Sequence, residues 1–187
     1  CVYYDNKENL LWVGTETGGV DVYKGNEKIA HYSEEEHNLT GGQVVSAIVD
    51  SEGGVWFGTP AKGLLRLNRQ TNKFEEFKLP YENKENRWIP VLSLFEDDDH
   101  NLWIGTYNGV FRYQLLTGEV VRIDGSDISI TSNLIRSLSQ DSEGNIWIGT
   151  MIDGVSVINS RFELVRKIDH TVNGITHMSC DSRGNMW

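Results

Sequence analysis

The sequence lacks two features that would each place it in a particular class of protein. It contains no apolar run of about 18 residues, which excludes a membrane-spanning helix within this segment. Basic residues are also scarce, because 17 Lys and Arg face 27 Asp and Glu and leave a net charge of −10. Nucleic-acid binding depends on basic side chains that neutralise phosphates, so we expect no nucleic-acid partner.

Cysteine is scarce too, and no leader is visible. The two cysteines, Cys1 and Cys180, lack the paired spacing of a zinc site and define no disulfide framework. They leave the redox compartment open. Residue 1 is not methionine, and no charged and apolar leader precedes the first expected strand, so we expect any targeting signal to lie outside this segment.

One short sequence motif recurs along the whole chain, and Trp147-Ile148-Gly149-Thr150 is a complete copy of it. A period in the forties, with short alternating apolar runs in each copy, is typical of propellers in which four strands form one blade. The sequence therefore predicts an all-β fold, a β-propeller of four-stranded antiparallel blades. The repeated tryptophans are 44, 47, 44 and 40 residues apart: Trp12, Trp56, Trp103, Trp147 and Trp187.

An acidic or amide residue stands six positions before each repeated tryptophan. The residues that follow it, such as Ser142-Glu143-Gly144-Asn145, have the composition of a tight turn, so each copy is expected to open with a β-hairpin. We expect the acidic side chain to lock this turn by accepting backbone hydrogen bonds; a calcium site is the alternative. The residues at this position are Asn6, Asp50, Asp97, Asp141 and Asp181.

The first and second strands of each copy are apolar on both faces, as the second strand of the fourth copy illustrates. Ile146 and Ile148 point to one side of the strand and Trp147 and Gly149 to the other, which predicts burial on both sides. Blades packed face to face would satisfy this pattern, with Trp filling the gap and Gly admitting the neighbouring backbone. The third and fourth strands alternate more openly and are expected to form the outer, partly solvated edge.

The register predicts a single propeller segment over 1–187, with blades at about 1–32, 43–79, 90–124 and 133–168 and a partial blade at 174–187. The chain begins in a first strand and ends just into a second, so no strand is left to close a ring. We expect an open arc of four blades plus a partial fifth, cut from a larger ring of about seven blades. Uncovered faces at its ends would favour pairing with another copy.

The stretch Asp141 to Thr150, which reads Asp-Ser-Glu-Gly-Asn-Ile-Trp-Ile-Gly-Thr, resembles the repeat of the two-component regulator propeller family. The segments Asn38-Leu39-Thr40 and Ile130-Thr131-Ser132-Asn133 fit its usual lead-in, and the resemblance extends over all four copies and the fifth fragment. Two positions depart from the pattern, because His100 replaces the turn Gly and Asn6 stands where Asp is usual.

This resemblance implies the periplasmic sensory region of a histidine kinase anchored in the inner membrane. Most often the parent is a hybrid two-component sensor of Bacteroides-type gut bacteria that detects glycan fragments. The resemblance therefore implies an oligosaccharide ligand and a homodimeric parent sensor. Membrane contact would be made only through parts of the parent outside this segment, and phosphorelay chemistry would lie there as well.

Other readings have less support in the residues. The Asp-box of sialidases has a similar hairpin, but here the Asp lies one residue too far from the Trp. The run Glu96-Asp97-Asp98-Asp99 could bind a cation or simply be a solvated hairpin tip. The histidines show no ligand spacing, and no nucleophile elbow or phosphate-binding loop occurs, so we expect no catalytic residue, metal or other cofactor. A structural or dimerising scaffold and a propeller lyase or hydrolase stay as alternatives.

A ligand site is expected among side chains that depart from the repeat, since the repeat itself serves packing. Connections entering the first strands converge on one end of a propeller, and Trp88, the one tryptophan outside the motif, lies in such a connection. Its ring beside Arg and Asn suits a sugar, including an anionic one; alternatively, Trp88 holds a long loop onto its blade. The expected ligand-binding residues are Arg87, Trp88, Tyr107, Asn108, Asn133 and Arg136.

Overall fold

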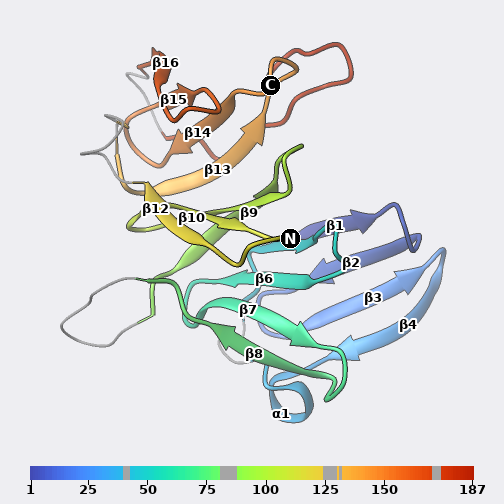
Figure 1. Cartoon of the computed structure of the whole chain (residues 1–187). Helices are drawn as coiled ribbons and strands as arrows, with labels where there is room; N and C mark the ends of the chain where they lie inside the picture. The colour runs from blue at the N-terminus through green and yellow to red at the C-terminus, as the bar shows by residue number, and fades with distance from the viewer. Residues whose placement is uncertain (40–42, 81–87, 124–129, 131, 170–173) are drawn as a thin grey trace. The chain divides into compact units, whose positions relative to one another are not determined.

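A computed structural model describes residues 1–39, 43–80, 88–123, 130, 132–169 and 174–187. Within these ranges the regular structure is β-sheet, apart from the one-turn helix α1 (Glu34–His37). The chain divides into two compact units, Cys1–Val91 and Leu92–Trp187, which run from blue to green and from green to red in Figure 1. The prediction of an all-β fold is confirmed.

The first unit contains two antiparallel sheets of four strands, and each sheet takes its strands in chain order (Figure 1). A short connection joins consecutive strands, so every sheet is a meander that forms one blade. The first blade consists of β1 (Val2–Asp5), β2 (Leu10–Gly14), β3 (Val20–Lys24) and β4 (Glu27–Tyr32), and the second of β5 (Ser46–Val49), β6 (Val55–Thr59), β7 (Gly63–Asn68) and β8 (Lys73–Phe77).

The second unit repeats this arrangement, and its first strand starts at the last residue of the first unit. The prediction of four-stranded antiparallel blades is therefore confirmed in both units. The third blade consists of β9 (Val91–Glu96), β10 (Asn101–Thr106), β11 (Gly109–Gln114) and β12 (Val120–Ile123), and the fourth of β13 (Ile135–Gln140), β14 (Ile146–Thr150), β15 (Val155–Ile158) and β16 (Leu164–Ile168).

The turn between the first and second strands places its fourth residue in the left-handed backbone region. Gly53, Gly144 and Gly184 have φ values of 81°, 83° and 81°, and His100 holds the equivalent position at 59°. The left-handed region costs glycine little but is unfavourable for a residue with a Cβ atom. His100 therefore adopts the conformation of the glycine that it replaces.

The turn between the second and third strands is closed by a threonine hydroxyl. Thr59 Oγ1 donates to the carbonyl of Gly63 at 3.1 Å and accepts from the amide of Lys62 at 3.1 Å. This side chain thus pairs two backbone groups of its own turn, as Thr residues in turns commonly do. Thr15, Thr106 and Thr150 make the same pair of bonds.

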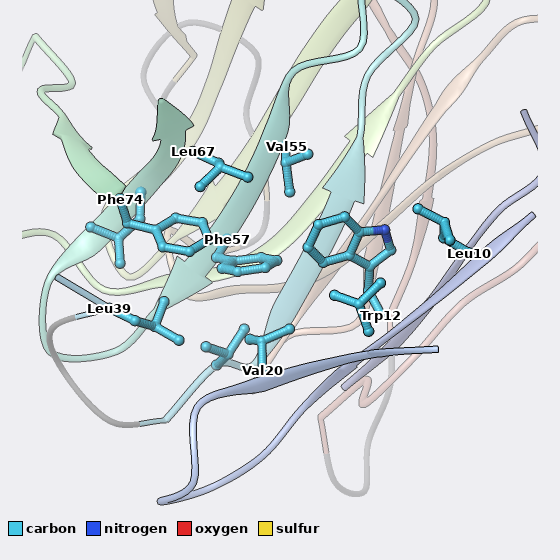
Figure 2. Close-up of a cluster of buried hydrophobic side chains, with 11 residues drawn as sticks. Leu10, Trp12, Val20, Leu39, Val55, Phe57, Leu67 and Phe74 are labelled. Atoms are coloured by element: carbon cyan, nitrogen blue, oxygen red, sulfur yellow. The ribbon is translucent and has the colours of Figure 1, made fainter. Parts of the chain in front are cut away.

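The two blades of the first unit pack through an aromatic and aliphatic core. Trp12 and Val20 of the first blade meet Phe57 and Phe74 of the second, and Figure 2 shows the Trp12 and Phe57 rings side by side. Their ring centroids are 6.0 Å apart in an edge-to-face arrangement, a favoured geometry for aromatic pairs. The expected filling of the gap between blades by a motif tryptophan is thus seen here.

The motif glycine allows close approach between the blades of the second unit. A Cβ atom built on Gly105 of β10 would lie 2.8 Å from Cγ2 of Ile135 on β13 and would also clash with the Ser93 hydroxyl. Gly149 of β14 is equally confined, with Ile175 at 2.8 Å and Met178 at 2.9 Å. These glycines therefore set how closely one sheet approaches the next layer.

Burial differs from the expected pattern in a first strand and in a third strand. The second strands β6 and β10 are buried along their whole length, as expected, and the fourth strand β16 is largely exposed. In the first strand β1 only Asp5 is buried, so the expectation of burial on both sides is wrong there. However, every residue of β15 is also buried, so the expectation of a partly solvated third strand is wrong there. Met178 and Ile175 of the following segment pack against Val155 and Val157 and supply the cover.

The last segment, where a partial blade is expected at 174–187, forms the tip of a hairpin. Its regular pairing is an isolated bridge between Cys180 and Met186, beside reciprocal backbone bonds between Ser179 and Trp187. Further back in the segment, Ile175 N donates to the carbonyl of Thr150 at 2.9 Å and Met178 N to the Ser137 hydroxyl at 2.8 Å. Val2–Asp5, the first strand of the chain, pairs with β2.

Gly105→Ala should destabilise the protein by about 1–3 kcal/mol, because overpacking a filled site forces neighbouring atoms to shift. Gly118→Ala is the control, since Gly118 has φ 76° but nothing within 4 Å of an added Cβ; its backbone strain alone should cost about 1 kcal/mol. Urea unfolding midpoints would measure both. A cost for Gly105→Ala no larger than that of the control would show that the blades do not constrain this position.

Candidate ligand-binding site

The repeat aspartates hold the tryptophans as well as the turns. Four copies have an aspartate six residues before the tryptophan. In each of them the Asp Oδ2 atom accepts a hydrogen bond from the indole N–H of that tryptophan. The other carboxylate oxygen accepts the backbone N–H of the residue four positions on, as in Gly54 N to Asp50 Oδ1 at 2.6 Å. The indole bonds are Trp56 to Asp50 at 2.6 Å, Trp103 to Asp97 at 2.6 Å, Trp147 to Asp141 at 2.8 Å and Trp187 to Asp181 at 3.0 Å.

The first copy is built differently. Its buried carboxylate is Asp5, whose Oδ1 accepts the amides of Lys7 at 2.9 Å and Glu8 at 3.4 Å, so Asp5 and not Asn6 receives these turn bonds. Asp5 lies seven residues before Trp12, one more than in the other copies. Among the residues that the structure describes, none accepts a hydrogen bond from the buried Trp12 indole N–H. The longer turn therefore leaves the indole N–H of Trp12 without a carboxylate acceptor.

Hydrogen bonding stabilises the ionised form of two of these carboxylates. At Asp141, burial raises the pKa, but hydrogen bonds from Trp147 and Asn145 outweigh it and leave the pKa below its usual range. At Asp181 the hydrogen bond from Trp187 is the largest cause of a lowered pKa, followed by that from Asn185. Both carboxylates thus accept several N–H donors, and hydrogen bonds to the ionised form favour that form.

The acidic hairpin tip of the third blade is likewise bonded internally. Asp97 accepts from Asn101 and Trp103 and from the amide of Asp99. Glu96 Oε1 lies 3.3 Å from Nδ1 of His100. Across the described part of the chain, no three His, Cys, Asp or Glu side chains are grouped as metal ligands.

In the first unit, Trp88 lies at the end of the second blade where β6 turns into β7. Its side chain is 41% exposed, and Lys62 Nζ stands 4.8 Å from the centroid of its ring. The β6–β7 turn lies close to the connection that holds Trp88. A Cβ atom built on Gly63 of this turn would be 2.9 Å from the carbonyl oxygen of Ile89. Arg87 falls outside the described residues.

In the second unit, the corresponding turn of the third blade carries Tyr107, which is 44% exposed, and Asn108. The carbonyl and side-chain oxygens of Asn108 accept from Arg122 Nε at 3.2 Å and Nη2 at 3.0 Å. Gly109 N donates to the carbonyl of Asn133 at 2.8 Å, which brings Asn108 and Asn133 together. Arg136 is exposed on β13.

Each unit thus combines the same two elements, a turn after a second strand and a connection into the next first strand. Lys62 and Arg122 join the expected residues, and sequence reasoning missed both. Lys62 lies in the β6–β7 turn, equivalent to the turn that holds Tyr107, so comparing these turns between copies would have found it. Nothing in the repeat indicates Arg122, since it belongs to a variable fourth strand.

These features define the chain as a β-propeller segment in which packing residues repeat and turn residues vary. Three parts of it, residues 38–61, 87–108 and 129–151, match the model described as two component regulator propeller. Each match runs from a lead-in through the tryptophan strand into the following turn. These three parts of the chain are two-component regulator propeller repeats.

The chain is also similar to parts of individual two-component signalling proteins. It is 34% identical to the extracellular domain of a putative hybrid two component system from B. thetaiotaomicron, with a TM-score of 0.80, covering 100% of this chain and 25% of that one. It is 30% identical over 164 residues to histidine kinase P4 of Formosa agariphila, covering 82% of this chain and 12% of the relative. The chain is thus a propeller segment related to the extracellular regions of hybrid two-component sensors, and it spans a quarter or less of these relatives.

A more distant likeness concerns the fold alone. Virginiamycin B lyase from Staphylococcus aureus has a TM-score of 0.74 at 16% identity, and the match covers 100% of this chain and 61% of that one. Propeller architecture supports unrelated functions, so this likeness carries no activity to the present chain. No helix among the described residues is long and apolar enough to cross a membrane.

Trp103→Phe should cost about 1–3 kcal/mol more stability than Trp12→Phe. Each change replaces a buried indole ring by a phenyl ring. Only Trp103→Phe also removes a hydrogen bond from the indole N–H, which leaves a carboxylate oxygen of Asp97 without that donor. Chemical unfolding of the two variants beside the wild type would measure the difference. Equal losses would mean that the carboxylate contributes nothing through the indole.

Stability should fall as the pH drops below about 4, the ordinary pKa range of Asp. A carboxyl group whose folded pKa is lowered contributes stability above its unfolded pKa, and this contribution is lost as the pH falls through the folded pKa. Asp141 and Asp181 both have lowered pKa values. Asp141→Asn should therefore show a flatter loss of urea midpoint between about pH 4 and pH 2. A profile as steep as that of the wild type would contradict this assignment.

Proposed function

We propose that the chain is part of the periplasmic ligand-sensing propeller of a hybrid two-component sensor histidine kinase, and that its ligand is an oligosaccharide. The observation that carries the proposal is the 34% identity, over the whole chain, with the extracellular domain of a putative hybrid two component system. In this proposal the parent is a homodimer anchored in the inner membrane. The segment itself binds and does not catalyse, and the kinase lies in another part of the parent.

In each unit, the turn after a second strand and the connection into the next first strand have suitable chemistry for a sugar. A half-exposed aromatic ring offers a flat apolar face for the C–H side of a pyranose, and Trp88 and Tyr107 both provide one. Amide and cationic groups beside these rings, from Asn108, Arg122 and Lys62, can pair with hydroxyl or carboxylate oxygens. The cations matter because the chain as a whole carries a net charge of −10. An anionic oligosaccharide would therefore need such local positive groups.

The position of these residues also suits signalling. Lys62 belongs to the turn of one blade, whereas Trp88 belongs to the connection that leads to the next strand. A ligand that contacts both would bind best at one spacing of turn and connection. Differential affinity of this kind is what allows a ligand to shift a conformational equilibrium.

The experiment is to mix the complete extracellular region of the sensor with purified oligosaccharides, measure heat of binding, and analyse the sugar afterwards. Binding with an unchanged sugar supports the sensor. Shortened or unsaturated products would instead identify a lyase or hydrolase. Absence of both binding and turnover across neutral and acidic oligosaccharides would leave a structural or dimerising scaffold.

Trp88→Ala should weaken oligosaccharide binding at least tenfold while the melting temperature stays nearly unchanged. Truncating an aromatic anchor typically costs more than about 2 kcal/mol of binding free energy, whereas a side chain that is 41% exposed contributes less to folding. Val165→Ala, at a position 56% exposed on β16, is the control and should alter neither property. A large fall in melting temperature with unchanged affinity would show that Trp88 only holds its loop.

A further inference from the structure

The first unit contains a pocket between its two blades, at the end opposite the turn that carries Lys62. It has a volume of about 260 Å³ and lies where β1 turns into β2 and where β7 turns into β8. Its walls are mainly aliphatic, whereas its rim is polar. The walls include Leu10, Val22, Ile29, Ala30 and Leu67, and the rim includes Glu8, Arg69 and Asn72.

The second unit has a phenylalanine at the position equivalent to Asn72. Asn68 and Asn159 each begin the turn from a third to a fourth strand, and the Oδ1 atom of each accepts the amide two residues later, at 2.9 Å and 3.0 Å. The residue just before the fourth-strand partner of that asparagine is left-handed in both turns, with φ 55° at Asn72 and 63° at Phe162. Asparagine accepts this conformation readily, but a bulky side chain makes it costly. The ring of Phe162 therefore needs contacts that compensate this cost.

These contacts are made with the motif tryptophan of the third blade. The centroid of the Phe162 ring is 6.1 Å from that of Trp103, and the guanidinium carbon of Arg112 is 4.8 Å from it. Arg112 is the residue of β11 that pairs with Trp103, and Val22 of β3 pairs with Trp12 in the same way. Trp12 and Val22 both line the pocket of the first unit. The space that a phenyl ring fills in the second unit is therefore open in the first.

A β-bulge adds an exposed aliphatic side chain to this open space. Val22 pairs with Ala30 and the next residue, Tyr23, pairs with Lys28, so Ile29 is the extra residue of the bulge. Bulges commonly redirect a side chain, and Ile29 is 49% exposed while it lines the pocket. Together with the half-buried Ala30, it gives the pocket an apolar surface that a ligand can reach.

We propose that this pocket binds the phenyl ring of a small aromatic molecule. The ring lies against Ala30 and Ile29, in the place that the Phe162 ring holds in the second unit, and its polar substituent extends past Arg69 into solvent. The volume is sufficient, since an apolar cavity of about 150 Å³ holds benzene. Arg69 is 54% exposed, so its guanidinium can cover one face of the ring, as that of Arg112 does at Phe162.

Other groups fit this pocket less well. A sugar ring would place several hydroxyl groups against aliphatic walls, which is unfavourable. An anion would meet the Glu8 carboxylate, which stands 3.9 Å from the Arg69 guanidinium and offsets its charge. A saturated ring would fill the same volume but would lack the electron-rich face that attracts a guanidinium.

The alanine methyl signals of the whole 187-residue chain provide a direct test, because its alanines are Ala30, Ala47 and Ala61. Ala30 lines the pocket, and Ala30→Gly identifies its signal by the loss of that signal. Titration with benzyl alcohol should move the Ala30 signal, with half-saturation at millimolar concentration, as expected for a ligand of this size. The Ala47 signal should stay in place as a report on the fold. Ala61 adjoins Lys62, so a shift confined to its signal would indicate binding at the proposed oligosaccharide site and would count against the pocket.

Asn72→Phe is the blocking variant. Its new ring should enter the pocket as that of Phe162 does, move the Ala30 signal in the free protein, and abolish the response to benzyl alcohol. Asn72→Gly tolerates the left-handed backbone and adds no ring, so it is the matched control and should respond like the wild type. Cyclohexylmethanol, the saturated counterpart of the probe, should compete at least about twofold more weakly than benzyl alcohol.

The proposal is overturned if benzyl alcohol leaves the wild-type Ala30 signal in place, or if Asn72→Phe responds to it like the wild type. An unmoved Ala30 signal in free Asn72→Phe would also contradict it, because the spaces in the two units would then not be equivalent. Equal competition by cyclohexylmethanol would show that the pocket does not select an aromatic ring. None of these outcomes depends on the ligand of the proposed sensor site.

Discussion

The hydrogen bond from a tryptophan indole to an aspartate six residues earlier organises each blade. The carboxylate accepts the indole through one oxygen and the turn amide through the other, as Asp50 does with Trp56 at 2.6 Å and Gly54 at 2.6 Å. One side chain thereby fixes both the hairpin and the orientation of the ring. Because Asp50 is only 1% exposed, its charge would be costly without these donors. The same contact therefore compensates the buried charge and positions the ring for packing.

Packing between blades then follows from the pattern around each tryptophan. The glycine two residues later has no room for a side chain, as the 2.8 Å approach to Ile135 shows at Gly105. The threonine after it closes the next turn through its own hydroxyl, so the residues between that threonine and the next glycine need not be conserved in type to keep the turn. Lys62 and Tyr107 occupy these positions in the second and third blades. The repeat thus leaves variable side chains at one end of each blade, where recognition is proposed.

The first blade shows what happens when the contact is altered. One extra residue separates Asp5 from Trp12, the carboxylate bonds to Lys7 and Glu8 instead, and the indole stays buried without an acceptor among the described residues. The ring still packs against Phe57, because its apolar surface does not depend on the N–H. A change of one residue in a turn has therefore separated the two roles of the tryptophan, since the ring keeps its packing and the indole N–H loses its carboxylate acceptor.

The sequence was sufficient to predict the blades, because their strands recur in register and each turn has its own chemistry. Trp, Gly and Asp positions revealed the hairpins and the close approach between sheets. Other features depend on spatial neighbours that periodicity does not describe. The full burial of β15 arises from cover by Ile175 and Met178, which its alternating sequence cannot indicate.

The candidate site was less predictable than the fold. Trp88 was singled out as the one tryptophan outside the repeat, yet its cation partner Lys62 comes from a turn in the preceding blade. The pairing of Asn108 with Arg122 joins a turn to a fourth strand, and fourth strands vary between copies. Such contacts between non-repeated residues leave no periodic trace. Ligand identity is a property of these same residues, so it does not follow from the repeat.

The central claim, that one carboxylate links the turn to the tryptophan, is tested most directly by a double-mutant cycle between Asp50 and Trp56. The cycle compares Asp50→Ala, Trp56→Phe and the double variant by urea unfolding, which separates their mutual term from the packing that each change removes. For a hydrogen bond to a buried charged group, the account predicts a coupling free energy of about 1–3 kcal/mol. A coupling below about 0.5 kcal/mol, the range found for independent sites, would contradict it.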